Sequence, residues 1–383
     1  MEKKKIKIVY VITRFRSSGP INQTYYIIKH LNKEFFEATV VSLFPEQRES
    51  KMSMYNEIGV PIIQLGMSKV ASMIRGSDVV YKVLNEIKPD IIQAVGIPPY
   101  RMTLKYSNVV HFVTLRNYCF EDYPIKYGWF KGWIMAHLDM SLIRNQLRKG
   151  EPFVTCSKSL SKIYQERENL TLGYIRNGVD VSQYMKRDVM TSASLRRKLG
   201  FPLEKKIFVY SGAISDRKNQ EEAIRGFLES SVSKSSLMLL LGDGTDLKRL
   251  KEKYYNFSNV IFKGKVSNVS DYLTASDVYI STSKSEGLPN GVLEAMAVGL
   301  PVLLSDIPQH MEILNVCPKI GLSYTLGDIK SLSKQFENIL KHNLYDMGNA
   351  AHDCVMNNFT SKEMSRKYQE LYKSIVNNKL WDS

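Results

Sequence analysis

The sequence predicts an α/β protein built from two doubly wound domains, each a parallel sheet covered by helices. Three observations favour this class. The chain has 383 residues, long for one hydrophobic core and suited to two domains of ordinary size. Short β-branched runs alternate with longer amphipathic runs throughout, which is typical of βαβ units. Two such series occur, separated by a polar, charged stretch near residues 165–205.

The β-branched runs give the expected strands in chain order. The first series predicts strands at Ile6–Ile12, Ala38–Ser42, Pro61–Leu65, Asp90–Val95, Val109–Leu115 and Phe153–Cys156. The second series predicts strands at Lys206–Gly212, Met238–Gly242, Val260–Gly264, Val278–Ser281, Pro301–Ser305 and Ile320–Tyr324. Ligands of such sheets bind beyond the carboxyl ends of the strands, so motifs at these ends are the first candidates for function.

The formal net charge of +15 is unevenly distributed. Residues 1–200 carry 31 Lys and Arg against 17 Asp and Glu, a net charge of +14, whereas residues 201–360 carry 17 against 18. A basic N-terminal half suits an anionic membrane or a nucleic acid. The plain alternative is a solvated basic surface without a partner.

The four cysteines, Cys119, Cys156, Cys317 and Cys354, are widely spaced and include no C-x-x-C pair. We therefore expect no zinc site, reduced thiols and a cytosolic chain. No run approaches the ~20 apolar residues of a transmembrane helix.

The most informative stretch of the chain runs from Ser285 to Ala297. Glu286 precedes a Gly/Pro turn, Asn290 is the expected helix N-cap, and Glu294 lies one turn inside the helix. Unpaired N–H groups at a helix N-terminus suit a diphosphate, and a carboxylate accepts two hydrogen bonds from a vicinal diol. The pattern indicates a sugar-nucleotide site; an ordinary loop-to-helix junction is the alternative.

This run resembles the E-x7-E motif of the family 4 glycosyltransferases, which are retaining enzymes of the GT-B fold. The resemblance covers essentially the whole chain and continues into Gly299-Leu300-Pro301-Val302. It implies two Rossmann-like domains facing a cleft, with Glu286 on the sugar and Glu294 on the ribose of the donor.

The segment Ser211–Asn219 resembles the family's G-R-L-x-x-x-K sequence, whose Arg and Lys bind the donor diphosphate. Lys218 matches the lysine, but Ala213 stands where the arginine belongs. Arg217 is our candidate for the missing charge. Fixed cations in a cleft would stabilise the leaving diphosphate. The alternative is a charged helix start on the surface.

The resemblance assigns further residues to donor binding, from the turns after several strands and from the Glu286 loop. They are Gly19, Gly212, Gly242, Val266, Gly287, Leu288, Pro289 and Asn290. No D-x-D motif occurs, and we expect neither a metal nor another cofactor, with the sugar nucleotide acting as substrate.

On the acceptor side, Arg116 replaces the histidine of the family's T-x-H-D sequence, and we expect it to bind a phosphate. Asn117, Glu121 and Asp122 follow it as acceptor-side candidates. His111 lies inside the preceding strand and is expected to be a core histidine.

The motif Tyr174–Asp180 resembles the I-P-N-G-V-D signature that leads into the second domain. We therefore expect domains at 1–172 and 173–361. The resemblance also implies that a last helix, within 362–383, crosses back to the first domain. Its expected buried face contains Tyr368, Leu371, Tyr372 and Ile375.

These observations predict a retaining hexosyl- or N-acetylhexosaminyltransferase of bacterial O-antigen, capsule or exopolysaccharide synthesis. We expect a UDP-sugar donor and a polyisoprenyl-diphosphate-linked acceptor at the cytoplasmic membrane face. The aromatic-basic segment around Trp129 and Trp133 suits a membrane interface, or an ordinary core helix. A GT-B-like sugar-nucleotide epimerase and a basic nucleic-acid-binding protein are the rival functions.

Overall fold

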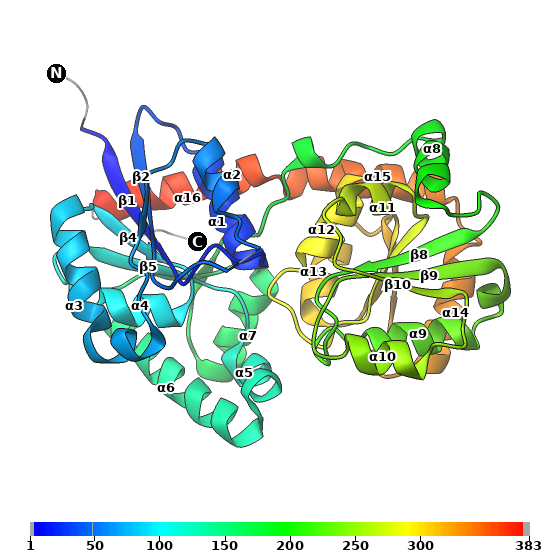
Figure 1. Ribbon diagram of the computed structural model, residues 1–383, viewed down its shortest axis with the longest axis horizontal. Helices are drawn as coiled ribbons and strands as arrows, with labels where there is room; N and C mark the ends of the chain where they lie inside the picture. The colour runs from blue at the N-terminus through cyan, green and yellow to red at the C-terminus, as the bar shows by residue number, and fades with distance from the viewer. Residues whose placement is uncertain (1–3, 48, 378–383) are drawn as a thin grey trace. The chain divides into compact units, whose positions relative to one another are not determined.

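The computed structural model describes residues 4–47 and 49–377, which form two compact units (Figure 1). Unit 1 contains the described residues up to Gly178 and those from Ser361 onward, and unit 2 is Val179–Thr360. Unit 1 is thus built from two separate pieces of the chain. The domain limits expected from the sequence, 172–173 and 361–362, stay predictions.

Unit 1 contains one seven-stranded sheet of order β3-β2-β1-β4-β5-β6-β7. All of its strand pairs are parallel. The strands are β1 Ile6–Ile12, β2 Phe36–Ser42, β3 Ile62–Gln64, β4 Ile91–Ala94, β5 Val110–Leu115, β6 Phe153–Thr155 and β7 Gly173–Tyr174. Six of them match expected strands to within two residues at either end, and the two-residue β7 was not expected.

The helices of unit 1 cover both faces of this sheet, as parallel strands require. They are α1 Gly19–Lys29, α2 Met52–Glu57, α3 Lys69–Ile87, α4 Ile97–Thr103, α5 Cys119–Tyr127, α6 Trp129–Arg148, α7 Lys158–Glu168 and α16 Ser361–Val376. Successive side chains of β1 point to opposite faces. Tyr10 therefore packs in the cluster of α1 and α16, whereas Val9 and Val11 pack in the cluster of α3.

Helix α16 completes the core of unit 1 and lies beside α1 (Figure 1). Its Tyr368 and Tyr372 are buried. The Tyr368 hydroxyl lies 2.8 Å from Thr114 Oγ1, and the Tyr372 hydroxyl donates to Gln93 Oε1. The prediction that a last helix returns to the first domain is confirmed. Gln93 of β4 is thus hydrogen-bonded to this helix.

Unit 2 contains a six-stranded parallel sheet of order β10-β9-β8-β11-β12-β13. The strands are β8 Lys206–Ser211, β9 Ser236–Leu241, β10 Val260–Gly264, β11 Val278–Ser281, β12 Val302–Ser305 and β13 Gly321–Tyr324. Each was expected to within two residues. Strands buried on both faces, such as β9 and β11, give the nearly unbroken apolar runs that predict them.

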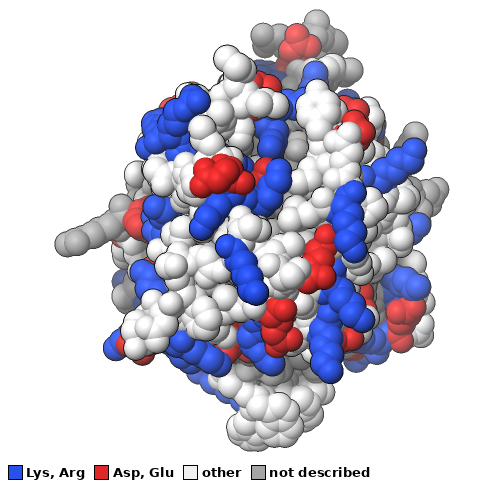
Figure 2. Space-filling view, turned by 90° about the vertical axis from the view of Figure 1, so that its right-hand side faces the viewer, with Lys and Arg blue, Asp and Glu red and all other residues white. Residues whose placement is uncertain are grey.

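The helices of unit 2 complete its layers. They are α8 Val189–Leu199, α9 Gln220–Glu229, α10 Leu247–Lys253, α11 Val269–Thr274, α12 Asn290–Ala297, α13 Pro308–Val316, α14 Ile329–Ile339 and α15 Leu344–Asn358, with 3-10 turns η1 Val181–Gln183 and η2 Ser231–Ser235. None of the described helices in either unit is long and apolar enough to cross a membrane. On the face shown in Figure 2, basic side chains are interspersed with acidic and uncharged ones.

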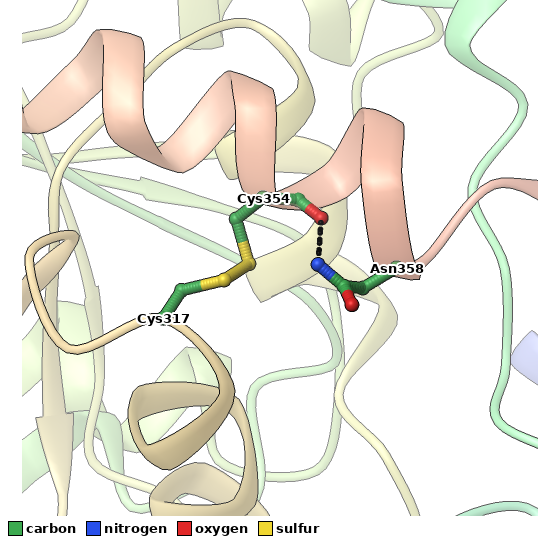
Figure 3. The surroundings of a disulfide bond; sticks show 3 residues. All are labelled: Cys317, Cys354 and Asn358. Atoms are coloured by element: carbon green, nitrogen blue, oxygen red, sulfur yellow. Dashed lines mark hydrogen bonds between the residues drawn. A yellow bond between two sulfur atoms is a disulfide. The ribbon is translucent and has the colours of Figure 1, made fainter.

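A disulfide joins Cys317, after α13, to Cys354 of α15 (Figure 3). The prediction of four reduced cysteines is therefore wrong for this pair, and Cys119 and Cys156 are buried. The two partners are 37 residues apart in sequence, and only the packing of unit 2 brings their Cα atoms to 6.1 Å. Cysteine spacing alone does not show such a pairing.

Candidate functional site

The strand order of unit 2 reverses between β8 and β11, which are neighbours in the sheet. The loops after these two strands leave the sheet at its carboxyl edge, where doubly wound proteins bind ligands. The loop after β8 contains Gly212, Arg217 and Lys218, and the loop after β11 contains Glu286. The predicted diphosphate and sugar residues are therefore brought to one place by the topology.

Glu286 is buried and is held by three side chains. Lys218 Nζ donates to its Oε1 at 2.5 Å, and Arg217 Nη1 donates to its Oε2 at 3.1 Å. Arg217 also donates to the Ser285 carbonyl at 2.6 Å, and Ser283 Oγ donates to Oε1 at 2.7 Å. The side chain of Arg217 thus points at Glu286. Whether it replaces the family arginine in catalysis stays a prediction.

The charged groups of this cluster shift one another's pKa values. Burial alone would raise the pKa of Glu286, but Lys218 and Arg217 outweigh it and hold that pKa well below its usual range. Burial also pulls the pKa of Lys218 down, against the attraction of Glu286. Two cations beside one carboxylate leave one positive charge in excess, which suits an anionic ligand.

Helix α12 begins at the same place. Its N-cap is Pro289, so the expectation that Asn290 is the cap is wrong: Asn290 is the first helical residue. Pro289 has extended backbone angles and suits the position before the helix. Gly287, Leu288 and Pro289 are buried in the preceding loop. The backbone N–H groups of the first turn are those that a diphosphate would bind.

Glycines allow these loops to approach closely. A Cβ on Gly291 would lie 2.4 Å from the Tyr279 hydroxyl, and a Cβ on Gly242 would lie 1.9 Å from the Gly212 carbonyl oxygen. Gly212 itself lies beside Lys218, whose Cε would be 3.9 Å from an added Cβ. Larger residues at Gly242 or Gly291 would push these loops apart.

Glu294, in the middle of α12, is partly buried and accepts a hydrogen bond from Tyr184. Burial raises the pKa of Glu294, while Tyr184 and the positive charge of Lys218 oppose the rise. The remaining donor-side residue, Val266, lies partly buried in the loop after β10. Ala213, at the position of the family arginine, is exposed after β8.

Five predicted residues belong to unit 1. Gly19 begins α1, directly after Ser18, whose hydroxyl is buried and has no hydrogen-bond partner in the part of the chain that the structure describes. Arg116 Nη1 donates to Asn177 Oδ1 at 2.9 Å, and Asn117 Nδ2 donates to Asp122 Oδ1 at 3.3 Å. Glu121 pairs with Arg167 at 2.6 Å. These polar side chains follow β5 and are tied to one another and to neighbouring loops, and their acceptor role stays a prediction.

His111 is a core histidine, as expected. It is buried, its Nδ1 lies 2.9 Å from Thr103 Oγ1, and its Nε2 lies 2.5 Å from the Tyr106 carbonyl oxygen. Both ring nitrogens are therefore satisfied. Burial lowers its pKa, so the ring is neutral.

Comparison with known proteins shows what the chain is similar to. Residues 191–358 match the family model described as "Glycosyl transferases group 1". The chain is a glycosyltransferase, and its residues 191–358 are similar to the group 1 family. The matched segment contains Lys218, Glu286 and Glu294, and so includes the whole unit 2 cluster.

Curated glycosyltransferases are among the relatives of the chain. The glycosyltransferase is 23% identical over 377 residues to the Escherichia coli O-antigen biosynthesis glycosyltransferase WclY, covering 97% of this chain and 99% of that protein. It is 26% identical over 219 residues to the Escherichia coli UDP-Gal:alpha-D-GlcNAc-diphosphoundecaprenol alpha-1,3-galactosyltransferase, covering 55% of this chain and 56% of that enzyme.

The fold of the glycosyltransferase is GT-B. The crystal structure of Anabaena HepE in complex with UDP-glucose superposes with a TM-score of 0.80 at 16% sequence identity. The superposition covers 96% of this chain and all of that one. At this identity the likeness shows the fold alone.

Sequence reasoning missed two residues that contact the E-x7-E glutamates of the glycosyltransferase, Ser283 and Tyr184. Ser283 donates to the Glu286 carboxylate, and Tyr184 contacts Glu294. The run Ser281–Ser285, unusually rich in hydroxyls before a glutamate, was a visible signal for Ser283. No local pattern pointed to Tyr184, which the fold brings to α12 from before α8. Within the described residues, no group of three or more His, Cys, Asp and Glu is placed to hold a metal ion.

Proposed function

We propose that this glycosyltransferase transfers a hexosyl or N-acetylhexosaminyl group, with retention, from a UDP-sugar to a hydroxyl of a polyisoprenyl-diphosphate-linked glycan. The product would enter a bacterial surface polysaccharide such as O-antigen, capsule or exopolysaccharide. The observation that supports this most strongly is the buried Glu286 carboxylate, held by Lys218 and Arg217 beside the start of α12.

Each group of the cluster has a task in this proposal. The bond from the sugar C1 to the diphosphate oxygen breaks, and a new C1–O bond to the acceptor forms on the same face. The acceptor's proton passes to a phosphate oxygen of the departing UDP. Lys218, Arg217 and the first-turn N–H groups of α12 stabilise the charge that grows on UDP. Glu286 holds sugar hydroxyls and Glu294 holds the ribose diol.

The acceptor class follows from the relatives and from charge. One relative acts, by its name, on a diphosphoundecaprenol-linked sugar, and another serves O-antigen biosynthesis. In this chain residues 1–200 carry a net charge of +14, which suits a substrate carrying a diphosphate in an anionic membrane. Arg116, in the position of the family histidine, is proposed to contact a phosphate.

The membrane surface we propose is the hairpin of α5 and α6 in unit 1. Gly132 allows the two helices to touch, since a Cβ there would lie 2.4 Å from the Tyr123 backbone. At the turn of the hairpin, Trp129 and Phe130 are 75% and 68% exposed. Exposed aromatic side chains next to Lys126 and Lys131 suit an interface with anionic lipid. In this proposal the enzyme works peripherally at the cytoplasmic face of the cell membrane.

Binding of sugar nucleotides tests the donor proposal directly. Thermal unfolding is measured with UDP, GDP and a panel of UDP- and GDP-sugars. A ligand present at 100 times its dissociation constant adds about 2.7 kcal/mol of stability. We expect stabilisation by UDP and by at least one UDP-sugar, and none by GDP. If the protein instead converts a bound UDP-sugar to its epimer without an acceptor, the epimerase hypothesis is correct. If no nucleotide stabilises the protein, the proposed function is wrong.

A further inference from the structure

His310 of unit 2 is a buried histidine that the proposed chemistry does not use. It is the third residue of α13, and its side chain has no exposed surface. Unlike His111, it is satisfied on one nitrogen only: Nδ1 lies 2.9 Å from Ser305 Oγ and 3.0 Å from the Ser305 carbonyl oxygen. Its Nε2 is buried and has no hydrogen-bond partner among the described residues.

The neighbouring hydrogen bonds decide which nitrogen carries the proton. Ser305 Oγ donates its only hydrogen to the Ser283 carbonyl oxygen at 2.8 Å. Both oxygens near Nδ1 are therefore acceptors, and Nδ1 must be the protonated nitrogen. Burial lowers the pKa of His310 to about 4, so the ring is neutral near pH 7. Nε2 is then a buried acceptor without a donor among the described residues, and a buried polar group of this kind calls for an explanation.

The same hydrogen bonds lead from His310 to the donor site. His310 holds Ser305, Ser305 holds the backbone of Ser283, and Ser283 Oγ donates to Glu286 Oε1 at 2.7 Å. Glu286 and Lys218 are also the charges that act on the His310 ring. His310 is thus joined to the carboxylate that we place on the transferred sugar.

We propose that His310 is a positioning residue of the donor site with two separate tasks. Its Nδ1–H fixes the Ser305–Ser283 chain that orients Glu286. Its Nε2 accepts a hydrogen bond from an O–H group that accompanies the bound donor, either a hydroxyl of the transferred sugar or a water that the sugar traps. This inference rests on the proposed function and extends it to the sugar subsite.

Two isosteric substitutions separate the two tasks. In His310→Asn the side-chain amide replaces Nδ1 and nothing replaces Nε2; in His310→Gln the amide replaces Nε2 and nothing replaces Nδ1. Calorimetry measures binding of UDP and of the UDP-sugar identified by the stabilisation screen. The sugar-dependent part of the affinity, which is the ratio of the two dissociation constants, is the quantity of interest.

We expect UDP affinity to stay within about twofold in both variants, because neither nitrogen faces the nucleotide in this proposal. His310→Asn should lower the sugar-dependent affinity by roughly three- to tenfold, the effect of one lost hydrogen bond. His310→Gln should lower turnover more than affinity, because Glu286 loses its orientation. His111→Asn, at the core histidine whose ring nitrogens both have partners, is the matched control. It should change neither the ratio of the two dissociation constants nor turnover.

The source of the O–H group is resolved with deoxy analogues of the UDP-sugar. If a sugar hydroxyl binds Nε2, one deoxy analogue loses affinity with wild type and loses no more with His310→Asn. If a trapped water binds Nε2, His310→Asn should lower the affinity for every deoxy analogue by the same factor as it lowers the affinity for the full UDP-sugar. Should His310→Gln fail to fold, Ser305→Ala breaks the same chain and must reduce turnover.

Two results would overturn the proposal. Wild type that binds no nucleotide would remove the proposed function together with this inference. The inference alone would be overturned if wild type binds the UDP-sugar and both His310 variants keep the wild-type turnover and the wild-type ratio of the two dissociation constants. A purely structural histidine gives that second result, with loss of thermal stability only.

Discussion

In the proposed mechanism, Glu286 neutralises the two cations that would bind the donor diphosphate. Lys218 and Arg217 both bind this carboxylate, so a diphosphate would have to compete with it for the same cations. We therefore expect Glu286→Gln to bind UDP several-fold more tightly than wild type, while turnover falls about 10²-fold through loss of the sugar contact. Calorimetry with UDP and a turnover assay measure the two effects.

Glu222→Gln is the matched control for this substitution. Glu222 is a buried carboxylate of the same unit whose Oε1 accepts from the Tyr324 hydroxyl and from the Gly327 N–H. It should leave UDP affinity unchanged. A tenfold loss of UDP affinity in Glu286→Gln would show instead that the carboxylate organises the cations for the nucleotide.

The lowered pKa of Glu286 has a consequence for acid stability. A carboxyl whose pKa is lower in the folded than in the unfolded state stabilises the fold fully above the unfolded pKa, about 4.5. This contribution is lost as the pH falls through the folded pKa. Wild type should therefore exceed Glu286→Gln in unfolding free energy at pH 6, and the difference should shrink steadily below about pH 4.5. Denaturant titrations from pH 6 downward measure it, and a pH-independent difference would contradict the ion pair.

Glu294 tests the ribose assignment. Glu294→Ala should weaken UDP binding about ten- to a hundredfold, because hydrogen bonds to a charged acceptor contribute roughly 1.5–3 kcal/mol. Tyr184→Phe removes only the hydroxyl that now contacts Glu294, and should change UDP affinity by less than about threefold. Equal UDP affinity in Glu294→Ala and wild type would refute the assignment.

At the scale of elements, the α5–α6 hairpin carries the membrane prediction. Replacing Trp129 and Phe130 by Ser should move the enzyme off anionic liposomes, and Lys131→Gln should weaken binding by about 1 kcal/mol at low salt. Arg144 is a poorer choice for this test, because it forms an ion pair with Glu168 at 2.6 Å. Arg144→Gln therefore serves as the comparison and should have the smaller effect on sedimentation with liposomes.

Unchanged sedimentation of the Trp129 and Phe130 double variant would contradict the membrane surface. Activity on a short water-soluble acceptor is the control, since Trp129 and Phe130 have no proposed role in chemistry. That activity should equal wild type.

Elements were largely predictable from the sequence, and the reason is physical. Strands buried on both faces, such as Val278–Ser281, require unbroken apolar runs that the sequence shows directly. The Glu286 and Lys218 positions could also be found, because each follows a strand in a recognisable motif. The inward turn of Arg217 could not, since a loop side chain has no periodicity. His310, Tyr184 and the Cys317–Cys354 bond depend on packing between distant segments, which local patterns do not encode.

At the scale of the whole molecule, α16 links residues from opposite ends of the described chain. The Tyr372 hydroxyl lies 3.1 Å from that of Tyr10, across 362 residues, and also donates to Gln93. Tyr372→Phe should destabilise unit 1 by about 1–3 kcal/mol, because it leaves Gln93 with an unpaired buried amide oxygen. Calorimetric unfolding should show a lower transition temperature for unit 1. The transition that UDP stabilises, which belongs to unit 2, should keep its wild-type temperature. If both transition temperatures fall, the two units unfold together.

The packing of α16 against β1 and α1 also limits when unit 1 can fold during translation. Strand β1 and helix α1 are made early, but the aromatic face that covers them is translated more than 300 residues later. At typical synthesis rates this interval is on the order of tens of seconds. During it, the apolar surface around Tyr10 and Phe112 has no native cover. Nascent chains of this enzyme should therefore bind chaperones until α16 emerges, although unit 2 has by then been translated in full.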